Sequence, residues 1–227
     1  MLNIQNVHKT FNKGTINEKV ALNNLNLTLQ TGDFVTVIGG NGAGKSTMLN
    51  MIAGVYPVDK GQIIIDGVDV TRQPDYKRAT YLGRVFQDPM MGTAADMEIQ
   101  ENLAMASRRG KKRTLRWGIT AQEKKIYQEK LAQFDLGLEK RMSSKVGLLS
   151  GGQRQAITLL MATLQNPKVL LLDEHTAALD PKTAAKVLKL TETIVAENNL
   201  TTIMITHNMR DAIHYGNRLV MMHEGQI

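Results

Sequence analysis

Residues 39–47 read Gly-Gly-Asn-Gly-Ala-Gly-Lys-Ser-Thr and match the phosphate-binding pattern G-x-x-x-x-G-K-[ST]. Glycines here let the backbone wrap closely around an anion, with N–H groups pointing inward. Lys45 would reach the β- and γ-phosphates of a nucleotide, and the Ser46 hydroxyl would ligate Mg²⁺. A chance glycine-rich turn is the alternative, but a strand candidate precedes the loop and a helix-compatible stretch follows it. We predict that these residues bind the nucleotide: Gly39, Asn41, Gly42, Ala43, Gly44, Lys45, Ser46 and Thr47.

Polar side chains also follow three further apolar runs of strand length. They are Gln87, Asp173, Glu174 and His207. Each of these residues alone can be explained without a function: Gln87 as a turn amide, Asp173 and Glu174 as solvated residues after a strand, and His207 as a cap. Together they would line one edge of the sheet, because ligands of an open parallel sheet bind outside the carboxyl ends of its strands. There Asp173 suits Mg²⁺ held through water, and Glu174 would orient and deprotonate an attacking water. Gln87 and His207 would position that water and hold the γ-phosphate, which is a hydrolase arrangement.

The elements that must position these groups are short apolar runs alternating with longer helical patterns. This order is typical of an α/β protein with a largely parallel sheet. We predict strands at residues 25–29, 34–38, 63–65, 81–86, 169–172, 201–205 and 218–222. The first of these alternates apolar and polar residues, as a half-exposed strand does, and the third ends in a tight Asp66-Gly67 turn.

Residues from about 93 to 165 have a mostly helical pattern. Thr120 and Glu123 form a predicted capping box that opens a helix through Phe134. Near the end of the chain, Pro181 occupies a favoured first-turn position of a helix whose apolar set follows helical spacing: Val187, Leu188, Thr191, Ile194 and Val195. We therefore predict a single domain over residues 1–227 that contains a helical subdomain at about 93–165.

Composition limits the classes of protein that remain. Hydrophobic residues are 42% and charged residues 22% of the 227, which is typical of a globular protein. No apolar run approaches the roughly eighteen residues of a membrane span, no secretory signal is recognisable, and there are no cysteines. The net charge of +7 permits acidic partners without choosing one, and aromatics at 4% disfavour binding to single-stranded nucleic acid.

The run Leu149-Ser150-Gly151-Gly152-Gln153 precedes a helical stretch and forms a second anion-binding helix start, with Ser150 as its cap. Its order in the chain relative to the phosphate loop, Gln87, Asp173-Glu174 and His207 resembles the nucleotide-binding subunit of ATP-binding-cassette (ABC) transporters. The resemblance covers essentially all 227 residues. It implies a P-loop NTPase core of the RecA type with a mainly parallel sheet, an N-terminal antiparallel β part and an inserted α-helical subdomain.

The resemblance also implies further roles. Phe11 stands where an aromatic side chain, more often Tyr, stacks on adenine, and Gln87 would be a metal ligand together with Ser46 and Asp173. The cofactors would be ATP and Mg²⁺. The signature residues Ser150, Gly151, Gly152 and Gln153, with Asp180 of the D-loop, would complete the nucleotide site, and His207 would be the switch histidine. Two positions depart from the family pattern, since His175 stands where Pro is common and Ala177 where Ser is common.

In this family the signature of one subunit completes the ATP site of the other, although spacing alone leaves a meeting within one chain open. By resemblance, two copies close head-to-tail over two ATP molecules and open after hydrolysis. The implied activity is an ATPase that powers translocation by separate transmembrane permease subunits. About 62 residues separate Gln87 from Ser150, which is room for the helical subdomain that receives the membrane partner.

A stand-alone cassette is typical of bacterial importers, and the run from Leu149 to Asp180 resembles a subgroup that imports small solutes such as amino acids with a binding protein outside the membrane. The expected location is the cytoplasmic face of the cell membrane, with a soluble cytosolic form when isolated. The alternatives are an exporter subunit, or a soluble ABC ATPase that acts on nucleic acid or ribosomes. The chain has neither the sustained heptads nor the second cassette of such soluble members, so no nucleic acid partner is expected.

Two features stay open at this point. Six basic residues form a cluster in the helical insert: Arg108, Arg109, Lys111, Lys112, Arg113 and Arg116. A solvated loop is the ordinary interpretation, and contact with acidic headgroups or a permease loop is the alternative. Glu224 to Ile227 read as a turn that enters another strand, and because members of the resembled family usually continue for some residues, truncation at Ile227 is left open.

Overall fold

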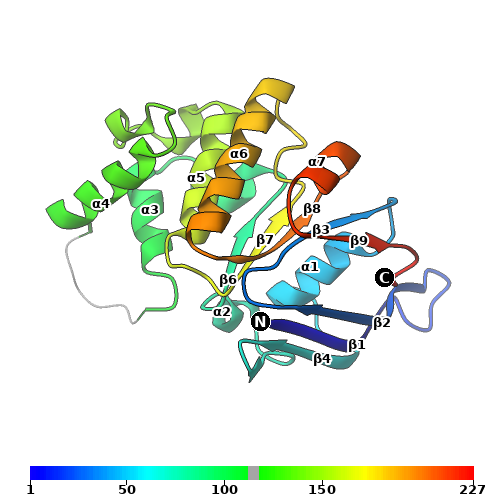
Figure 1. The fold of residues 1–227 in the computed structure, drawn as a ribbon. Helices are drawn as coiled ribbons and strands as arrows, with labels where there is room; N and C mark the ends of the chain where they lie inside the picture. The colour runs from blue at the N-terminus through cyan, green and yellow to red at the C-terminus, as the bar shows by residue number, and fades with distance from the viewer. Residues whose placement is uncertain (112–117) are drawn as a thin grey trace.

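The computed structural model describes residues 1–111 and 118–227, and it contains two β-sheets with helices between and beside them (Figure 1). The larger sheet is parallel, with strand order β6-β7-β8-β3-β9. Its strands are β3 (Phe34–Gly39), β6 (Leu82–Val85), β7 (Val169–Asp173), β8 (Thr201–Ile205) and β9 (Arg218–Met222). The carboxyl ends of these strands share one edge, as the sequence predicts.

The central strands of this sheet are apolar on both faces. Every residue of β8 is buried, and so are the first four residues of β7. Continuous apolar runs of this kind are expected in parallel strands, because helices cover both faces of such a sheet. The predicted ranges 34–38, 169–172, 201–205 and 218–222 are therefore confirmed within one residue, and the range 81–86 shortens to Leu82–Val85.

The smaller sheet is antiparallel, with strand order β2-β1-β4-β5. It contains β1 (Leu2–Phe11), β2 (Lys19–Leu29), β4 (Lys60–Ile65) and β5 (Val68–Asp69). Leu25, Leu27 and Leu29 are buried while the residues between them are exposed, which confirms the predicted alternation at the end of β2. Asp66 and Gly67 have φ of 52° and 80°, so they form the predicted tight turn between β4 and β5.

Strand β1 is absent from the strands predicted above, and its backbone shows why. Leu2 and Ile4 are buried and alternate regularly, but the pairing with β2 shifts between Ile4 and Val7. Asn6 lies in this irregularity with φ of 48°. A bulge of this kind inserts a residue into the strand and breaks the period of two on which sequence prediction depends.

Helix α1 (Lys45–Ala53) lies between the two sheets (Figure 1). Its side chains Met48, Leu49 and Ile52 pack in one core with apolar residues of both sheets. Because α1 directly follows β3 and the phosphate loop, this core fixes the loop at the carboxyl edge of the parallel sheet. At the other end of α1, Arg78 of the short helix α2 (Asp75–Arg78) is 1% exposed and bonds to the carbonyl oxygens of Met51 and Ile52.

A second core lies on the other face of the parallel sheet and is built mainly by helices. These are α3 (Ile99–Ser107), α4 (Ala121–Ala132), α5 (Gly151–Thr163) and α6 (Pro181–Glu197), with the short helices η1 (Pro89–Gly92), η2 (Leu138–Lys140) and η3 (Val146–Leu148). The described part of residues 93–165 is helical, as predicted; its separation as a subdomain stays a prediction. A last helix, α7 (Met209–His214), packs beside β3.

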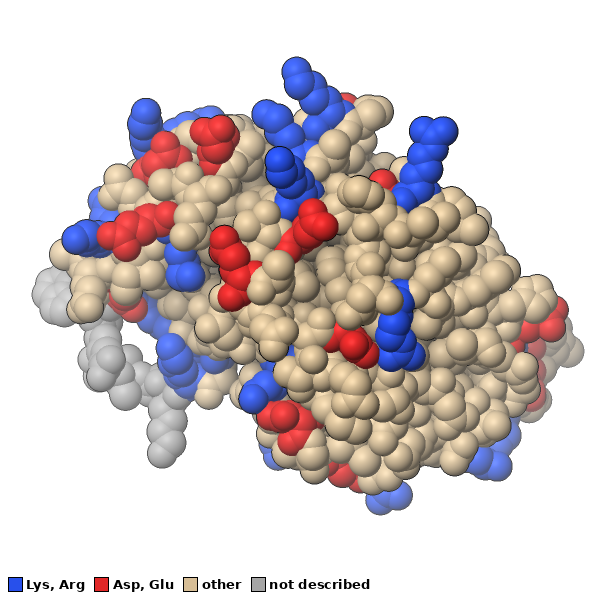
Figure 2. Space-filling view, in the orientation of Figure 1, with Lys and Arg blue, Asp and Glu red and all other residues tan. Residues whose placement is uncertain are grey.

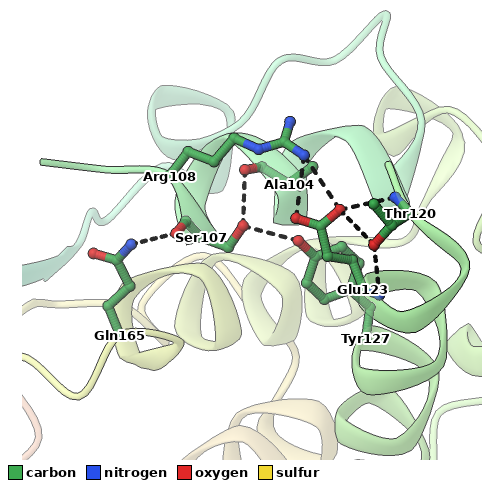
Figure 3. Close-up of polar contacts among 7 residues, drawn as sticks. All are labelled: Ala104, Ser107, Arg108, Thr120, Glu123, Tyr127 and Gln165. Atoms are coloured by element: carbon green, nitrogen blue, oxygen red, sulfur yellow. Dashed lines mark hydrogen bonds and ion pairs between the residues drawn. The ribbon is translucent and has the colours of Figure 1, made fainter. Parts of the chain in front are cut away.

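Polar contacts join α3 to α4 and to the end of α5 (Figure 3). Ser107 Oγ lies 2.8 Å from Tyr127 Oη, and Arg108 Nη2 lies 3.2 Å from Glu123 Oε1. Gln165 donates to the Ser107 carbonyl oxygen. These contacts hold the end of α3 against α4 and against the residues that follow α5.

The predicted caps are confirmed. Thr120 Oγ1 accepts from Glu123 N, the Glu123 side chain bonds back to Thr120 N, and the helix ends at Ala132, two residues before the predicted end. Within residues 1–111 and 118–227, no helix combines the length and apolar character that a membrane crossing requires.

Candidate functional site

The phosphate loop joins β3 to α1, and its own lysine holds it in shape. Lys45 is 6% exposed, and its Nζ donates to the carbonyl oxygens of Gly39 at 2.7 Å and Gly40 at 3.1 Å. Gly42 and Gly44 have φ of 82° and 101°, a region in which side chains with a Cβ are strained. The loop is therefore folded around the Lys45 ammonium group.

The amino end of α1 opens into this loop. Gly44 is the N-cap residue and has no side chain to bond the first N–H groups of the helix. A Cβ at Gly44 would meet the Ala21 carbonyl oxygen at 2.6 Å, so a larger residue with a capping side chain does not fit. Free N–H groups, a helix dipole and a buried lysine together form an anion-binding site.

A pocket of about 230 Å³ lies over the loop. It is lined by Phe11, Lys19, Ala21, Asn41, Gly42, Ala43, Gly44, Lys45, Ser46, Thr47, Glu174 and His207. Sequence analysis singled out all of these residues except Lys19 and Ala21. The pocket thus brings together segments from β1, β2, the phosphate loop and the ends of β7 and β8.

Glu174 and His207 contact each other at this pocket. His207 Nε2 lies 2.6 Å from Glu174 Oε1, and the side chains are 48% and 13% exposed respectively. The Glu174 backbone N donates to the Ile205 carbonyl oxygen, which joins the ends of β7 and β8. Glu174 also has φ of 48°, in the left-handed region that non-glycine residues rarely occupy. Such backbone strain of about 1–3 kcal/mol is often found at functional positions.

Asp173, one residue earlier, has a partner that sequence analysis missed. Arg84 Nη2 of β6 lies 3.5 Å from Asp173 Oδ2, and both side chains are 15% exposed. Burial raises the pKa of Asp173, while the positive charge of Arg84 acts in the opposite direction. The guanidinium group also lies over the Phe86 ring, with its Cζ 4.5 Å from the ring centroid. The sequence did carry a signal, because Arg84 is the one charged residue in the apolar run 81–86.

Neither Asp173 nor Gln87 lines the pocket over the loop. Gln87 is exposed, two residues beyond the end of β6, and its neighbour Phe86 accepts a hydrogen bond from Gln155 Nε2 of α5 through its carbonyl oxygen. The metal and positioning roles of Gln87 therefore stay predictions.

The donor set fits Mg²⁺, although the described residues contain no cluster of three or more metal-binding side chains. Mg²⁺ usually takes one or two protein ligands, with water and substrate phosphates filling its other positions. Ser46 lines the pocket, and Asp173 is the last residue of β7 at the same sheet edge. One hydroxyl and one carboxylate at this edge match that requirement.

The signature residues form the start of α5, as predicted. Ser150 Oγ accepts from Gln153 N, and Gln153 Oε1 accepts from Ser150 N, which completes a capping box. A Cβ on Gly152 would collide with Thr183 of α6, so glycine is required where the two helices meet. None of these residues lines the pocket over the phosphate loop, and Ser150 and Gly151 are exposed.

The segment between Glu174 and α6 contains Asp180 and both departures from the family pattern. Asp180 is the N-cap of α6 and accepts from Thr183 N at 3.1 Å. His175 is fully enclosed beneath this segment, and its Nε2 lies 3.2 Å from Thr191 Oγ1 of α6. Burial lowers the pKa of His175 to about 4, so the ring is neutral at physiological pH and has a structural position. Ala177 lines a neighbouring pocket of about 360 Å³ between α6 and α7.

Phe11 ends β1 at the open side of the pocket. Its ring packs edge-on against Tyr56, with ring centroids 5.2 Å apart and planes at 81°. The ring also lines the pocket over the phosphate loop. Its stacking on adenine stays a prediction. Lys9 Nζ lies 5.6 Å from the ring centroid and also pairs with Asp59.

The basic cluster is only partly described by the structure. Arg108 pairs with Glu123, and Arg109 is half-buried with its Nη2 3.4 Å from the Ala162 carbonyl oxygen. Lys112, Arg113 and Arg116 lie outside the described residues. Two of the six members thus make contacts within the helical region, whereas the ordinary interpretation was a solvated loop. On the face seen in Figure 2, acidic and basic side chains are interspersed.

Comparisons with known proteins identify the family of the chain. The family model described as ABC transporter matches residues 22–177, more than half of the chain. A tyrosine transport ATP-binding protein of Clostridioides difficile is 44% identical over the whole chain, which spans 90% of that relative. The methionine import ATP-binding protein MetN 2 of Enterococcus faecalis is 32% identical, and the spermidine/putrescine import ATP-binding protein PotA of Haemophilus influenzae is 34% identical. The chain spans only 64% and 56% of these two.

Solved structures of cassettes are similar over the whole chain. A dimeric structure of the bacterial ABC transporter cassette MJ0796 has a TM-score of 0.84 at 28% identity, and the chain covers 96% of it. A dimeric post-hydrolysis state of the same cassette, bound to ADP and Pi, has a TM-score of 0.82 at the same identity and coverage. With the phosphate loop, the Glu174–His207 contact and the capped signature helix in place, the chain belongs to the ABC transporter family and is an ATP-binding cassette with ATPase activity.

Proposed function

We propose that this cassette hydrolyses ATP to power the import of a small solute, of the amino-acid class, through separate permease subunits at the cytoplasmic face of the membrane. The observation that carries the proposal is the placement of the Glu174–His207 pair opposite the phosphate loop, in one pocket with Phe11. A carboxylate, an imidazole and an anion site in one pocket suit the attack of water on a terminal phosphate.

Each group then has a defined task. The loop amides and Lys45 hold the phosphates, and Phe11 stacks on the base. Ser46 and Asp173 hold Mg²⁺, with Gln87 as a further ligand, and the ion neutralises charge on the phosphates when it is bound. Glu174 accepts the proton of the attacking water, and His207 orients the Glu174 carboxylate through the 2.6 Å contact and binds the γ-phosphate.

A second copy of the chain completes the site. The pocket of about 230 Å³ is smaller than the roughly 300–1,000 Å³ typical of small-molecule sites, and its walls include no signature residue. Ser150 and Gly151 are exposed at the amino end of α5, free to meet a phosphate from another copy. The dimeric cassettes among the similar structures support a head-to-tail arrangement, in which the phosphate bridges two surfaces and its loss releases them.

The direction and cargo of transport are inferred from relatives. The tyrosine transport protein is 44% identical over the whole chain, and the methionine and polyamine relatives are named as import subunits. These names support import of an amino acid, with tyrosine as the first cargo to test. An extracytoplasmic binding protein would deliver the cargo, and the permease would carry it across the membrane.

Glu174→Gln tests the proposal in two settings. The amide keeps the shape of the side chain but accepts no proton, so ATP binding by the purified protein is expected to stay within about twofold while turnover falls by at least 10²-fold. The variant with bound ATP should also accumulate as a dimer, measured by light scattering. In cells that depend on this gene, uptake of labelled tyrosine should be lost with the same variant.

Glu197→Gln is the matched control, since Glu197 is an exposed carboxylate at the carboxyl end of α6. It should leave turnover and uptake unchanged. Undiminished ATPase activity of Glu174→Gln would remove Glu174 from its proposed role. Full loss of ATPase with unchanged uptake of tyrosine, methionine and spermidine would overturn the import of these cargoes. Strong stimulation of the ATPase by DNA or ribosomes would favour the soluble class of ABC proteins.

A further inference from the structure

Lys19 is the one lysine or arginine of the pocket outside the phosphate loop, and sequence analysis gave it no role. It is the first residue of β2 and pairs directly with Phe11, the last residue of β1. Side chains that lie directly opposite each other in an antiparallel pair project from the same face of the sheet. Lys19 therefore starts beside the ring on which the base is proposed to stack.

The Lys19 side chain reaches the phosphate loop. Its Nζ lies 3.6 Å from the position that a Cβ on Gly42 would occupy. Gly42 is a central residue of the loop and has φ of 82°. Because it has no side chain, the Lys19 ammonium group approaches the loop backbone directly. Lys19 thus extends from the base end of the pocket to the phosphate end.

The ammonium group has no competing partner in the described structure. Within residues 1–111 and 118–227 Lys19 makes no ion pair, whereas Lys9 on the neighbouring strand is bound to Asp59 at 2.9 Å. Lys45 lies on the inner side of the loop, bonded to two of its carbonyl oxygens. The two lysines therefore approach a ligand in the loop from different sides.

We propose that Lys19 is a nucleotide-contact residue whose ammonium group binds the phosphates that ADP and ATP share. The inference rests on the proposed placement of the nucleotide between Phe11 and the loop. A nucleotide whose base stacks on Phe11 and whose phosphates enter the loop would pass the Lys19 ammonium group before its terminal phosphate. A flexible lysine then adds a charge-assisted contact that does not depend on the γ-phosphate.

Lys19→Met tests this contact because it keeps the apolar length of the side chain and removes the charge. Binding of ADP and of ATP to the full chain without Mg²⁺, measured by calorimetry, is expected to weaken by the same factor, about five- to tenfold. Lys19→Arg should recover most of the affinity. The melting temperature of Lys19→Met without nucleotide should equal that of wild type. A lower melting temperature is expected if Lys19 only stabilises the fold.

Two comparison variants make the outcomes distinct. Lys60→Met removes an exposed lysine from β4, on the side of β1 away from β2, and should leave both affinities unchanged. Lys45→Ala should weaken binding through the loop itself. If Lys45→Ala weakens binding and Lys19→Met does not, the role of Lys19 is wrong while the proposed site stands.

Three further outcomes would contradict the proposal. If neither Lys45→Ala nor Lys19→Met weakens binding, the placement of the nucleotide in this pocket is wrong. A loss confined to ATP would overturn the assignment to the shared phosphates. An equal loss in Lys60→Met would reduce the effect to general electrostatic attraction.

Discussion

At the scale of single residues, the segment after β7 combines a strained carboxylate with an enclosed imidazole. Glu174 has φ of 48° and faces the pocket, while His175 turns inward and contacts Thr191. Adjacent side chains thus point to opposite sides of the segment. The contact of His175 with α6 holds the backbone from which Glu174 projects.

The buried imidazole predicts a dependence of stability on pH. Its pKa falls from 6.5 to about 4 because burial disfavours the charged form. The His175 ring therefore binds a proton more readily in the unfolded chain than in the folded chain. Its contribution to the unfolding free energy is complete above pH 6.5 and is lost as pH falls toward 4. Between pH 7.5 and 5 we expect His175 to account for about 2 kcal/mol of lost unfolding free energy.

Urea unfolding of wild type and His175→Gln at the two pH values, without nucleotide or Mg²⁺, measures this term. The variant should lose about 2 kcal/mol less than wild type on acidification. Thr191→Val is the control, because it removes the hydroxyl partner but leaves the imidazole buried, so the wild-type pH dependence should persist. Equal losses in wild type and His175→Gln would show that the ring is accessible to solvent when folded.

At the scale of elements, the two ends of α1 have different neighbours, one adjacent in sequence and one distant. Its amino end carries the phosphate loop, and its carboxyl end is bound by the buried guanidinium of Arg78. Arg78 donates to four carbonyl oxygens, those of Met51, Ile52, Thr71 and Gln73. A cation near the carboxyl end of a helix also complements the helix dipole.

Arg78→Met is expected to lower the unfolding free energy by about 3–5 kcal/mol, because it removes a buried donor from four carbonyl oxygens, of which the Met51 oxygen keeps a bond from Gly54 N. Chemical denaturation measures the change. Lys77→Met, an exposed change in the same short helix, should alter stability by less than about 0.5 kcal/mol. A loss below about 1 kcal/mol in Arg78→Met would mean that water replaces the guanidinium group.

The same scale shows what the sequence can predict. The strands of the parallel sheet and the caps at Thr120 and Ser150 were predictable, since continuous apolar runs and capping boxes are local signals. Strand β1 was not, because the bulge at Asn6 breaks its period. The pairings of Arg84 with Asp173 and of Lys19 with Phe11 depend on strand order and register, which no local pattern contains.

At the scale of the whole molecule, the signature residues of one copy do not line the pocket over its own phosphate loop. A site shared by two copies predicts complementation between two defective variants. Ser150→Asp keeps a capping side chain but places a carboxylate where a phosphate would bind, and Lys45→Ala disables the loop. Each variant alone should lose at least tenfold in ATPase activity.

A mixture of the two variants should recover activity well above their sum, because the loop of the Ser150→Asp copy meets the intact signature of the Lys45→Ala copy. Ser150→Asn, which caps the helix without a charge, is the control and should retain most activity alone. The measurement is ATPase rate against the ratio of the two proteins. A rate that equals the sum at every ratio would place the whole site within one chain.

The hydrogen bonds from Lys45 to the carbonyl oxygens of Gly39 and Gly40 also bear on what happens between one turnover and the next. A loop tied down by its own ammonium group keeps its shape after the products leave, so little chain entropy has to be given up when fresh nucleotide arrives. Binding of the next nucleotide then exchanges the carbonyl oxygens of Gly39 and Gly40 for phosphate oxygens around the Lys45 ammonium group, without refolding of the loop.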